Sequence, residues 1–273
     1  MEPGDGRDMR VLRLPKPFAS LARWTMAVLA WLVVMAVGSS TAVALNPYGL
    51  GSSGTAPLTA ANARIGALFS SSNISNGHYC SASVVDSPGG DVIVTAAHCL
   101  SSDSDGKAVF VPGYRAGQTP YGVWTVADVV ESSNWTAQGD PDYDVAFALL
   151  DPVKGKEIES VVGGNELGID LSPAQQITLT GYPQSSDLPL TCSNHIGLFS
   201  STQLSITCAN YTSGTSGSPW VVPGKLGRTH DEGTVMGVIG GFEQGGYTPD
   251  VSYSVYFGDA IGTLYQQAVT MVR

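Results

Sequence analysis

The chain has 273 residues, of which 43% are hydrophobic and 13% are charged, so it can bury a sizeable core and differs from a disordered acidic tail. Its formal net charge of −10 argues against a nucleic acid as partner, because binding to phosphates needs clustered Lys and Arg side chains. The 33 glycines and 16 prolines favour a turn-rich β protein over a helical one, since both residues interrupt helices and separate short strands.

The first 44 residues differ in composition from the rest of the chain. Five basic residues lie between Arg7 and Arg23, an uncharged apolar run follows at 25–37, and small residues end the segment at Ala42-Val43-Ala44. This order is typical of a signal peptide, and we expect cleavage after Ala44 and a secreted, extracellular product. The alternative is an uncleaved membrane anchor, for which thirteen apolar residues are short of the roughly 20 that a span needs.

The four cysteines are Cys80, Cys99, Cys192 and Cys208, and export would place them in an oxidising compartment. There they indicate disulfides, because the paired spacings typical of a zinc site are missing from the sequence. Four cysteines allow three pairings, of which the sequential one, Cys80 with Cys99 and Cys192 with Cys208, is the most economical. We expect no metal and no cofactor, although the carboxylates of "SSDSDG" (101–106) leave a calcium site open.

From about residue 60 the chain consists of short segments rich in Val, Ile, Tyr, Phe and Thr, separated by turn clusters, which predicts strands. The predicted strands are "SASVV", "DVIVTAA", "KAVFVPG", "YGVWTVADVV", "DVAFALL", "QITLTGYP", "TVMGVIGG" and "VSYSVYF". One helix is expected, "GDAIGTLYQQAV" from residue 258, because Ile261, Leu264, Tyr265 and Ala268 fall on one of its faces.

The domain organisation follows from where this pattern breaks. Residues 45–60 are interpreted as a linker or short propeptide, and the polar, glycine-bearing stretch 151–168 separates two strand-rich halves. Two β barrels or sandwiches of about 100 residues each fit this length. We place them at about 61–155 and 165–273 within one domain, 61–273.

His98 and Asp144 are candidates for a proton-transfer pair. A lone histidine is more often structural, but His98 ends an apolar strand in "VTAAHCL" next to Cys99, and a bridged strand end supplies the rigidity that a general base needs. Asp144 directly precedes the apolar strand "DVAFALL", whereas its competitors Asp140 and Asp142 do not. Asp144 is therefore the carboxylate most easily buried and held in place.

The segment "GTSGSPW" (214–220) offers two serines as nucleophile. Acyl transfer needs a hydroxyl next to backbone N–H groups that point at the developing oxyanion, and Gly214 and Gly217 give Ser216 the backbone freedom for such a turn. Ser218 is followed by Pro219, which restricts φ and leads into a strand. We expect Ser216 as nucleophile, with the N–H groups of Gly214 and Ser216 as the oxyanion hole.

The order of these residues along the chain excludes two classes of hydrolase. An α/β-hydrolase needs Ser, acid and then His, and the only histidine after Ser216 is His230, with no Asp or Glu between them. A subtilisin-type enzyme begins with Asp, and the strand-rich pattern does not predict an α/β fold. The order His98, Asp144, Ser216 remains.

With "TAAHC" (95–99), "DVA" (144–146) and "GTSGSP" (214–219) in this order, the chain resembles the trypsin- and chymotrypsin-like serine peptidases over roughly residues 62–270. The short loops and "SGSP" are most similar to the bacterial secreted, glutamyl-endopeptidase-like branch. The resemblance implies an all-β fold of two antiparallel β-barrels with the site between them. It also implies that His98 and Asp144 come from the first barrel and Ser216 from the second, and that Cys80 bridges to Cys99.

The resemblance also points to the substrate-binding residues. Asn210 lies six positions before Ser216, where trypsin-like members carry an aspartate for basic substrates, and Ile239 stands where glutamate-specific members carry a histidine. A neutral residue before the scissile bond is therefore the default expectation. The substrate backbone is expected to pair along Gly240, Gly241 and Phe242 as an added strand.

The predicted function is that of a secreted, monomeric serine endopeptidase acting on protein or peptide substrates, with membrane association only if residues 1–44 stay attached. The alternative is a secreted binding protein on an inactive protease scaffold. Asn73, Asn134 and Asn210 lie in N-x-S/T sequons, whose modification depends on the host.

Overall fold

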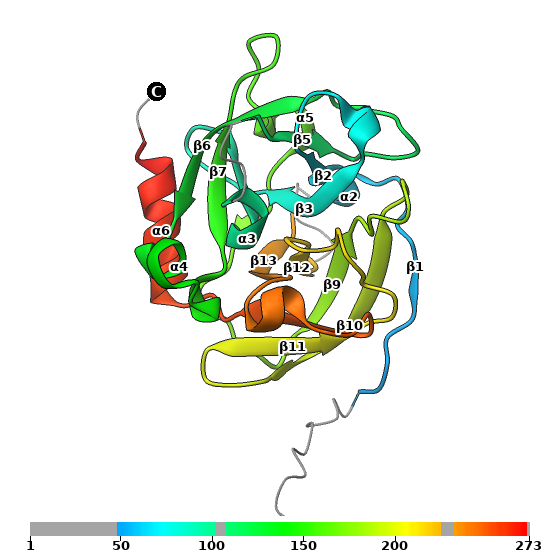
Figure 1. Cartoon of the computed structure of the whole chain (residues 1–273), viewed down its shortest axis with the longest axis vertical. Coiled ribbons are helices and arrows are strands. Elements are labelled where there is room, and N and C mark those ends of the chain that lie inside the picture. Colours follow the sequence, from blue (N-terminus) through cyan, green and yellow to red (C-terminus); the bar gives the residue numbers. More distant parts are fainter. Residues whose placement is uncertain (1–47, 102–106, 225–231, 272–273) are drawn as a thin grey trace, which may run out of the picture. The chain divides into compact units, whose positions relative to one another are not determined.

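The computed structural model describes residues 48–101, 107–224 and 232–271. The predicted signal peptide, the carboxylates of 102–106 and His230 lie outside these residues. Figure 1 shows the arrangement of the strands and helices. Among the described helices, none has the length and apolar character needed to cross a membrane.

The first half of the fold is a closed antiparallel barrel of six strands in the order β2-β3-β4-β7-β6-β5. The strands are β2 (Ile65–Phe69), β3 (His78–Val84), β4 (Val92–Thr95), β5 (Val109–Pro112), β6 (Trp124–Glu131) and β7 (Ala146–Leu150). Strands β4 and β7 pair over their full described register, from Val92 opposite Leu149 to Thr95 opposite Ala146. Because the two strands are antiparallel, the segment that follows β4 and the segment that precedes β7 lie at the same edge of the barrel.

The second half is an 8-stranded sheet with the order β14-β11-β10-β9-β12-β13-β8, and β1 pairs with β10 outside this path. The strands are β1 (Ser53–Thr55), β8 (Glu166–Leu167), β9 (Gln176–Gly181), β10 (Leu190–Leu198), β11 (Gln203–Thr207), β12 (Pro219–Val222), β13 (Thr234–Val238) and β14 (Val251–Val255). The sheet curls so that β13 and β14, which are not neighbours in this order, approach each other. Val238 N–H donates to Ser254 Oγ, and Gly240 N–H donates to Tyr253 O. These two bonds join β13 to β14 without a regular ladder.

The predicted all-β class is confirmed, and each of the predicted strand segments contains a strand. Four strands were not predicted, β2, β8, β10 and β11, of which β8 lies in the stretch 151–168 that was expected to separate the two halves. The residues expected to form a linker also carry a strand, β1, whose Gly54 lies opposite Thr191 of β10. Whether a propeptide is removed there stays a prediction.

Helices are few and short except for the predicted C-terminal one, which is confirmed as α6 (Asp259–Val269). Its residues Ile261, Leu264 and Ala268 are buried. The Tyr265 ring contacts Phe147 of β7 at a centroid distance of 5.5 Å. The helix thus packs on β6 and β7 of the first barrel, although it follows the second half in sequence (Figure 1).

The two halves share part of their core. One buried cluster fills the first barrel and another fills the second sheet, but a third contains residues of both. In this shared cluster Val94 and Phe147 of the barrel pack with Val235 and Val238 of β13. Apolar burial contributes about 25 cal/mol per Å² of surface removed from water, so the shared cluster holds the halves against each other.

Both sequential disulfides are present, Cys80–Cys99 and Cys192–Cys208. The first joins β3 to the short helix α3 (Ala97–Leu100), and the second joins β10 to the residue after β11. The sequential pairing is therefore confirmed.

Replacing Cys192 and Cys208 together by alanine should lower the free energy of unfolding by about 3 kcal/mol, because the bridge closes a loop between residues 16 positions apart. Urea unfolding of the native and substituted proteins measures this as a lower midpoint with a similar slope. Equal midpoints would contradict the expected contribution.

Candidate active site

His98 is held from two directions at the edge of the first barrel. It lies in α3, directly after β4, and its neighbour Cys99 is bridged to Cys80 of β3. The His98 side chain is 14% exposed, so its ring is fixed by the protein yet open to solvent on one side. This is the setting that the sequence predicted for a general base.

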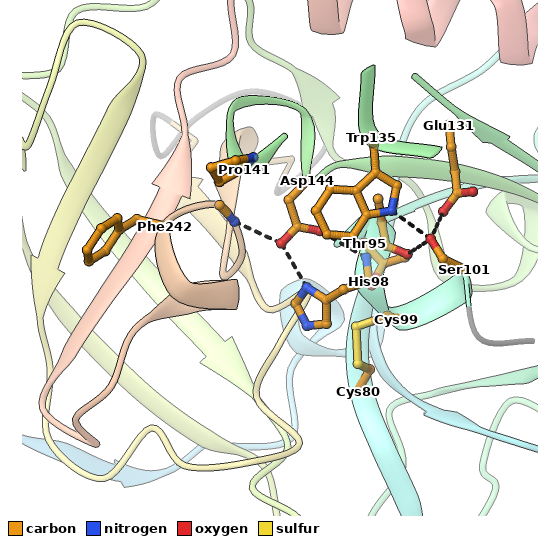
Figure 2. Close-up of polar contacts among 12 residues, drawn as sticks. Cys80, Thr95, His98, Cys99, Ser101, Glu131, Trp135, Pro141, Asp144 and Phe242 are labelled. Atoms are coloured by element: carbon orange, nitrogen blue, oxygen red, sulfur yellow. Dashed lines mark hydrogen bonds and ion pairs between the residues drawn. A yellow bond between two sulfur atoms is a disulfide. The ribbon is translucent and has the colours of Figure 1, made fainter. Parts of the chain in front are cut away.

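Asp144 is fully buried and accepts hydrogen bonds from three donors. Its Oδ2 lies 2.8 Å from His98 Nδ1 and 2.9 Å from the N–H nitrogen of Gly241, and its Oδ1 accepts from the backbone N–H of His98 at 2.9 Å. Figure 2 shows the carboxylate between the imidazole and this second-half backbone group. A carboxylate only accepts hydrogen bonds, so Nδ1 carries the ring proton and Nε2 is left as the acceptor.

The two competing aspartates have other roles. Asp140 Oδ1 accepts from the N–H of Asp142 at 3.0 Å and so caps the short 3-10 helix η2 (Pro141–Tyr143). Asp142 Oδ1 accepts from Gln203 Nε2 at 2.7 Å. Of the three aspartates, only Asp144, at the end of η2, has a carboxylate that is hydrogen-bonded to His98.

A polar network behind His98 was not predicted from the sequence. Trp135 Nε1 donates to Ser101 Oγ at 2.7 Å, and Ser101 Oγ donates to Glu131 Oε1 at 2.5 Å (Figure 2). Burial raises the pKa of Glu131, the hydrogen bond from Ser101 opposes this shift, and the charge of Asp144 adds to it. The network ties β6 and α4 (Ser133–Gln138) to the end of the helix that carries His98.

The loop that carries Ser216 is anchored to both halves of the fold. The N–H of Ser81 in β3 donates to Ser216 O at 2.7 Å, and the N–H of Gly217 donates to Ile239 O at 2.7 Å. Gly217 has φ +78, and a Cβ there would lie 2.1 Å from Ser81 O. The close approach of this loop to β3 therefore requires glycine.

Two N–H groups of this loop are left unpaired. Within the described part of the chain, the N–H groups of Gly214 and Ser216 donate no hydrogen bond, whereas those of Thr215, Gly217 and Ser218 all do. Gly214 has φ +92, and a Cβ on it would lie 2.6 Å from the nitrogen of Gln184. The loop thus offers two neighbouring donors to a ligand oxygen, as an oxyanion hole does.

The structure distinguishes the two serines by their burial. Ser216 is partly exposed and lines a pocket, whereas Ser218 is fully buried, and its Oγ has no hydrogen-bond partner among the described residues. Ser218 Oγ packs against the backbone of Gly181, where a Cβ would lie 1.7 Å from it. Ser218 therefore cannot reach a substrate. Ser216 Oγ likewise makes no hydrogen bond within the described residues, so its bond to His98 Nε2 stays a prediction.

The pocket beside Ser216 has a volume of about 430 Å³. Its lining comprises residues 211–213, 215–216, 239, 243–249 and 252. Ile239 belongs to it, as expected, whereas Asn210 is not among its lining residues and donates its N–H to Asp250 Oδ1 at 3.2 Å. The loop at 243–249 was not predicted to line it, although its run of glycines after β13 is a signal for such a loop.

The residues expected to pair with a substrate backbone already use their N–H groups within the protein. Gly240 donates to Tyr253 O, Gly241 donates to Asp144, and Phe242 donates to Gln203 Oε1 at 3.2 Å. Pairing of a substrate along these residues stays a prediction, and in this conformation it has to use their carbonyl groups.

Three potential metal ligands lie together, Cys80, His98 and Cys99. Both sulfurs are in the disulfide, so neither can provide the thiolate that a metal ion would need. This cluster is therefore part of the support for His98 and does not fit a metal site.

The comparisons with known proteins concern the family and the fold of the chain. Residues 80–225, more than half of the chain, match the model of the trypsin-like peptidase domain, and no curated protein matches the chain. Protease Anisep from Arthrobacter nicotinovorans is 25% identical, with a TM-score of 0.65 over 80% of this chain and 100% of that one. The thermostable serine protease AL20 from an extremophilic microorganism is 29% identical, with a TM-score of 0.65 over 78% of this chain and 100% of that one.

A Glu endopeptidase in complex with MPD is 16% identical, with a TM-score of 0.61 over 81% of this chain and 98% of that one, and shows the fold alone. The fold and the matched family together define a serine-type peptidase. The chain belongs to the trypsin-like peptidase domain family.

Ser218→Ala should leave turnover within a few-fold of the native value and should stabilise the fold or leave it unchanged, because it removes a buried hydroxyl without a partner, worth about 1 kcal/mol. Thermal unfolding and peptide hydrolysis of the purified variant measure both effects. Loss of turnover in a folded Ser218→Ala protein would contradict the choice between the serines.

Proposed function

We propose that the chain is a secreted serine endopeptidase in which Ser216 is the nucleophile, His98 the general base and Asp144 the residue that orients the base. The observation that carries the proposal is the hydrogen bond between the buried Asp144 carboxylate and His98 Nδ1. Ser216 lines a pocket and is partly exposed, so a substrate can reach it. Nε2 of His98 is then the free acceptor for the Ser216 proton.

The proposed reaction proceeds by acyl transfer. Ser216 Oγ attacks the carbonyl carbon of the scissile peptide bond while His98 Nε2 takes the hydroxyl proton. The oxygen of the tetrahedral intermediate becomes negative, and the N–H groups of Gly214 and Ser216 donate to it. His98 then returns the proton to the leaving amine, and water hydrolyses the acyl-enzyme by the same steps.

Asp144 serves the base in two ways. Its hydrogen bond to Nδ1 holds the imidazole in the tautomer with Nε2 free, and its negative charge stabilises the imidazolium that forms when Nε2 takes the proton. Because Asp144 is buried with three donors, its charge acts on His98 with little solvent screening.

Secretion is supported by the basic and apolar pattern of residues 1–44 and by the two disulfides, which form and persist in oxidising compartments. N-terminal sequencing of the protein from culture medium tests this, and we expect it to begin at Leu45 or later. A product that stays in the membrane fraction and retains residues 1–44 would favour the anchor.

Ser216→Ala should remove nearly all turnover, a loss on the order of 10⁶-fold, while thermal unfolding stays unchanged, because only the attacking hydroxyl is lost. A small phosphonate or sulfonyl fluoride should label the native protein at Ser216, as located by peptide mass spectrometry, and should leave Ser216→Ala unlabelled. Ser218→Ala is the matched control and should still be labelled. A native protein that is folded but does not react would favour the alternative, a binding protein on an inactive scaffold.

Asp144→Asn should lower kcat by about 10⁴-fold, because the amide can hold the imidazole in the wrong tautomer and carries no charge. Asp142→Asn is the control, since it makes the same change two residues away on a carboxylate that bonds Gln203. Steady-state kinetics on a peptide substrate compare the two. Similar kcat values for both variants would contradict the role of Asp144.

A further inference from the structure

Among the described residues that line the pocket beside Ser216, Glu243 is the only one whose side chain has a formal charge. It lies in η3 (Phe242–Gly245), and its side chain is exposed. The rest of the described lining consists of hydroxyl, amide, aliphatic and glycine residues. The charge preference of the pocket therefore depends first on this carboxylate.

The backbone around Glu243 is held in an uncommon conformation. Glu243 and Gln244 have φ values of 51° and 53°, in the left-handed region that non-glycine residues rarely adopt. The turn is closed by bonds from Gln244 N–H to Gly241 O at 2.9 Å and from Gly246 N–H to Glu243 O at 3.2 Å. A conformation of this kind costs on the order of 1 kcal/mol per residue and persists only where the surroundings impose it.

The turn also packs directly against the pocket wall. A Cβ on Gly245 would lie 2.5 Å from Cγ2 of Ile239, which lines the same pocket. A hydrogen bond with the Glu243 side chain raises the pKa of the neighbouring Tyr247 hydroxyl. The backbone of this turn thus places Glu243 at the pocket.

Among the described residues, the surrounding half of the protein contains no Lys or Arg that could neutralise this charge, whereas Lys225, Arg228 and Arg273 lie outside the described residues. Residues 166–224 contain three carboxylates and residues 232–271 contain four, Glu243 included, and neither range contains a Lys or Arg. Within the described residues Glu243 forms no ion pair. One sign of charge around a concave site raises the local concentration of ligands of the other sign.

We infer that this pocket takes the positively charged side chain of a Lys or Arg residue on the amino side of the scissile bond, with Glu243 as its counter-ion. The inference rests on the proposed function, since the pocket receives the side chain before the scissile bond only if Ser216 is the residue that attacks the adjacent carbonyl. It replaces the neutral default, which considered only Asn210 and Ile239. A substrate glutamate is disfavoured by the same carboxylate.

The test compares peptides that differ only in the residue before the scissile bond: Arg, its neutral isostere citrulline, and Glu. For the native protein we expect kcat/KM for Arg to exceed that for citrulline by about fivefold, the upper end of what an exposed ion pair contributes. In Glu243→Gln the ratio should fall to about 1, and in Glu243→Lys the Glu peptide should become better than the Arg peptide. Glu166→Gln, exposed on β8 and outside the pocket, should keep the native ratio.

Salt dependence gives a second measurement that needs no variant. Screening shortens the reach of a charge to about 8 Å at physiological ionic strength and about 3 Å at 1 M, so the native Arg to citrulline ratio should fall as salt is added. A native ratio near 1, or a ratio unchanged in folded Glu243→Gln, would overturn the inference. Labelling of Ser216 separates this failure from that of the proposed function: a labelled protein without charge preference disproves only the inference, whereas an unlabelled one disproves the function.

Discussion

The buried carboxylate of Asp144 is the interaction on which the rest of the site depends. An isolated charge in a protein interior costs several kcal/mol, and here three hydrogen bonds offset that cost. Two of the donors belong to His98 in the first half of the fold and the third is Gly241 in the second. The carboxylate is satisfied only when the halves are packed, which the shared core around Val94, Phe147 and Val238 achieves.

A short chain of covalent and hydrogen bonds links the base to the serine loop. His98 is next to Cys99, which is bridged to Cys80, and the residue after Cys80 is Ser81, whose N–H donates to Ser216 O. A shift of β3 would therefore move both loops together. This coupling restrains the relative position of His98 and Ser216, which the proposed general base catalysis needs to within a fraction of an ångström.

The charge distribution of the chain bears on what the site binds. The second half supplies the serine loop and the pocket, and its described residues carry carboxylates without Lys or Arg. The acidic composition, which at first only argues against nucleic acid, then favours cationic peptides as substrates. Within the pocket, Glu243 is the residue to which we assign this preference.

Much of the fold and site followed from the sequence by itself. Strand alternation and turn residues predicted most of the strands, and the terminal helix followed from its apolar face, because local patterns reflect burial directly. The strands β10 and β11 were missed because Ser, Thr, Asn and Gln interrupt their apolar residues, and tertiary pairing overrides such weak local preference. The order of His98, Asp144 and Ser216 identified the class of chemistry, since that order differs between unrelated hydrolase folds.

Only the tertiary structure showed what each of several neighbouring residues of the same type contacts. The sequence favoured Asp144 over Asp140 and Asp142, and Ser216 over Ser218, and the structure shows the different burial and hydrogen bonds of these residues. The same holds for the pocket, where Glu243 lies beside Ser216 although 27 positions separate them in the chain. Sequence patterns report which residues are buried along one strand or helix, whereas a site is built from contacts between distant segments, which only the packed fold brings together.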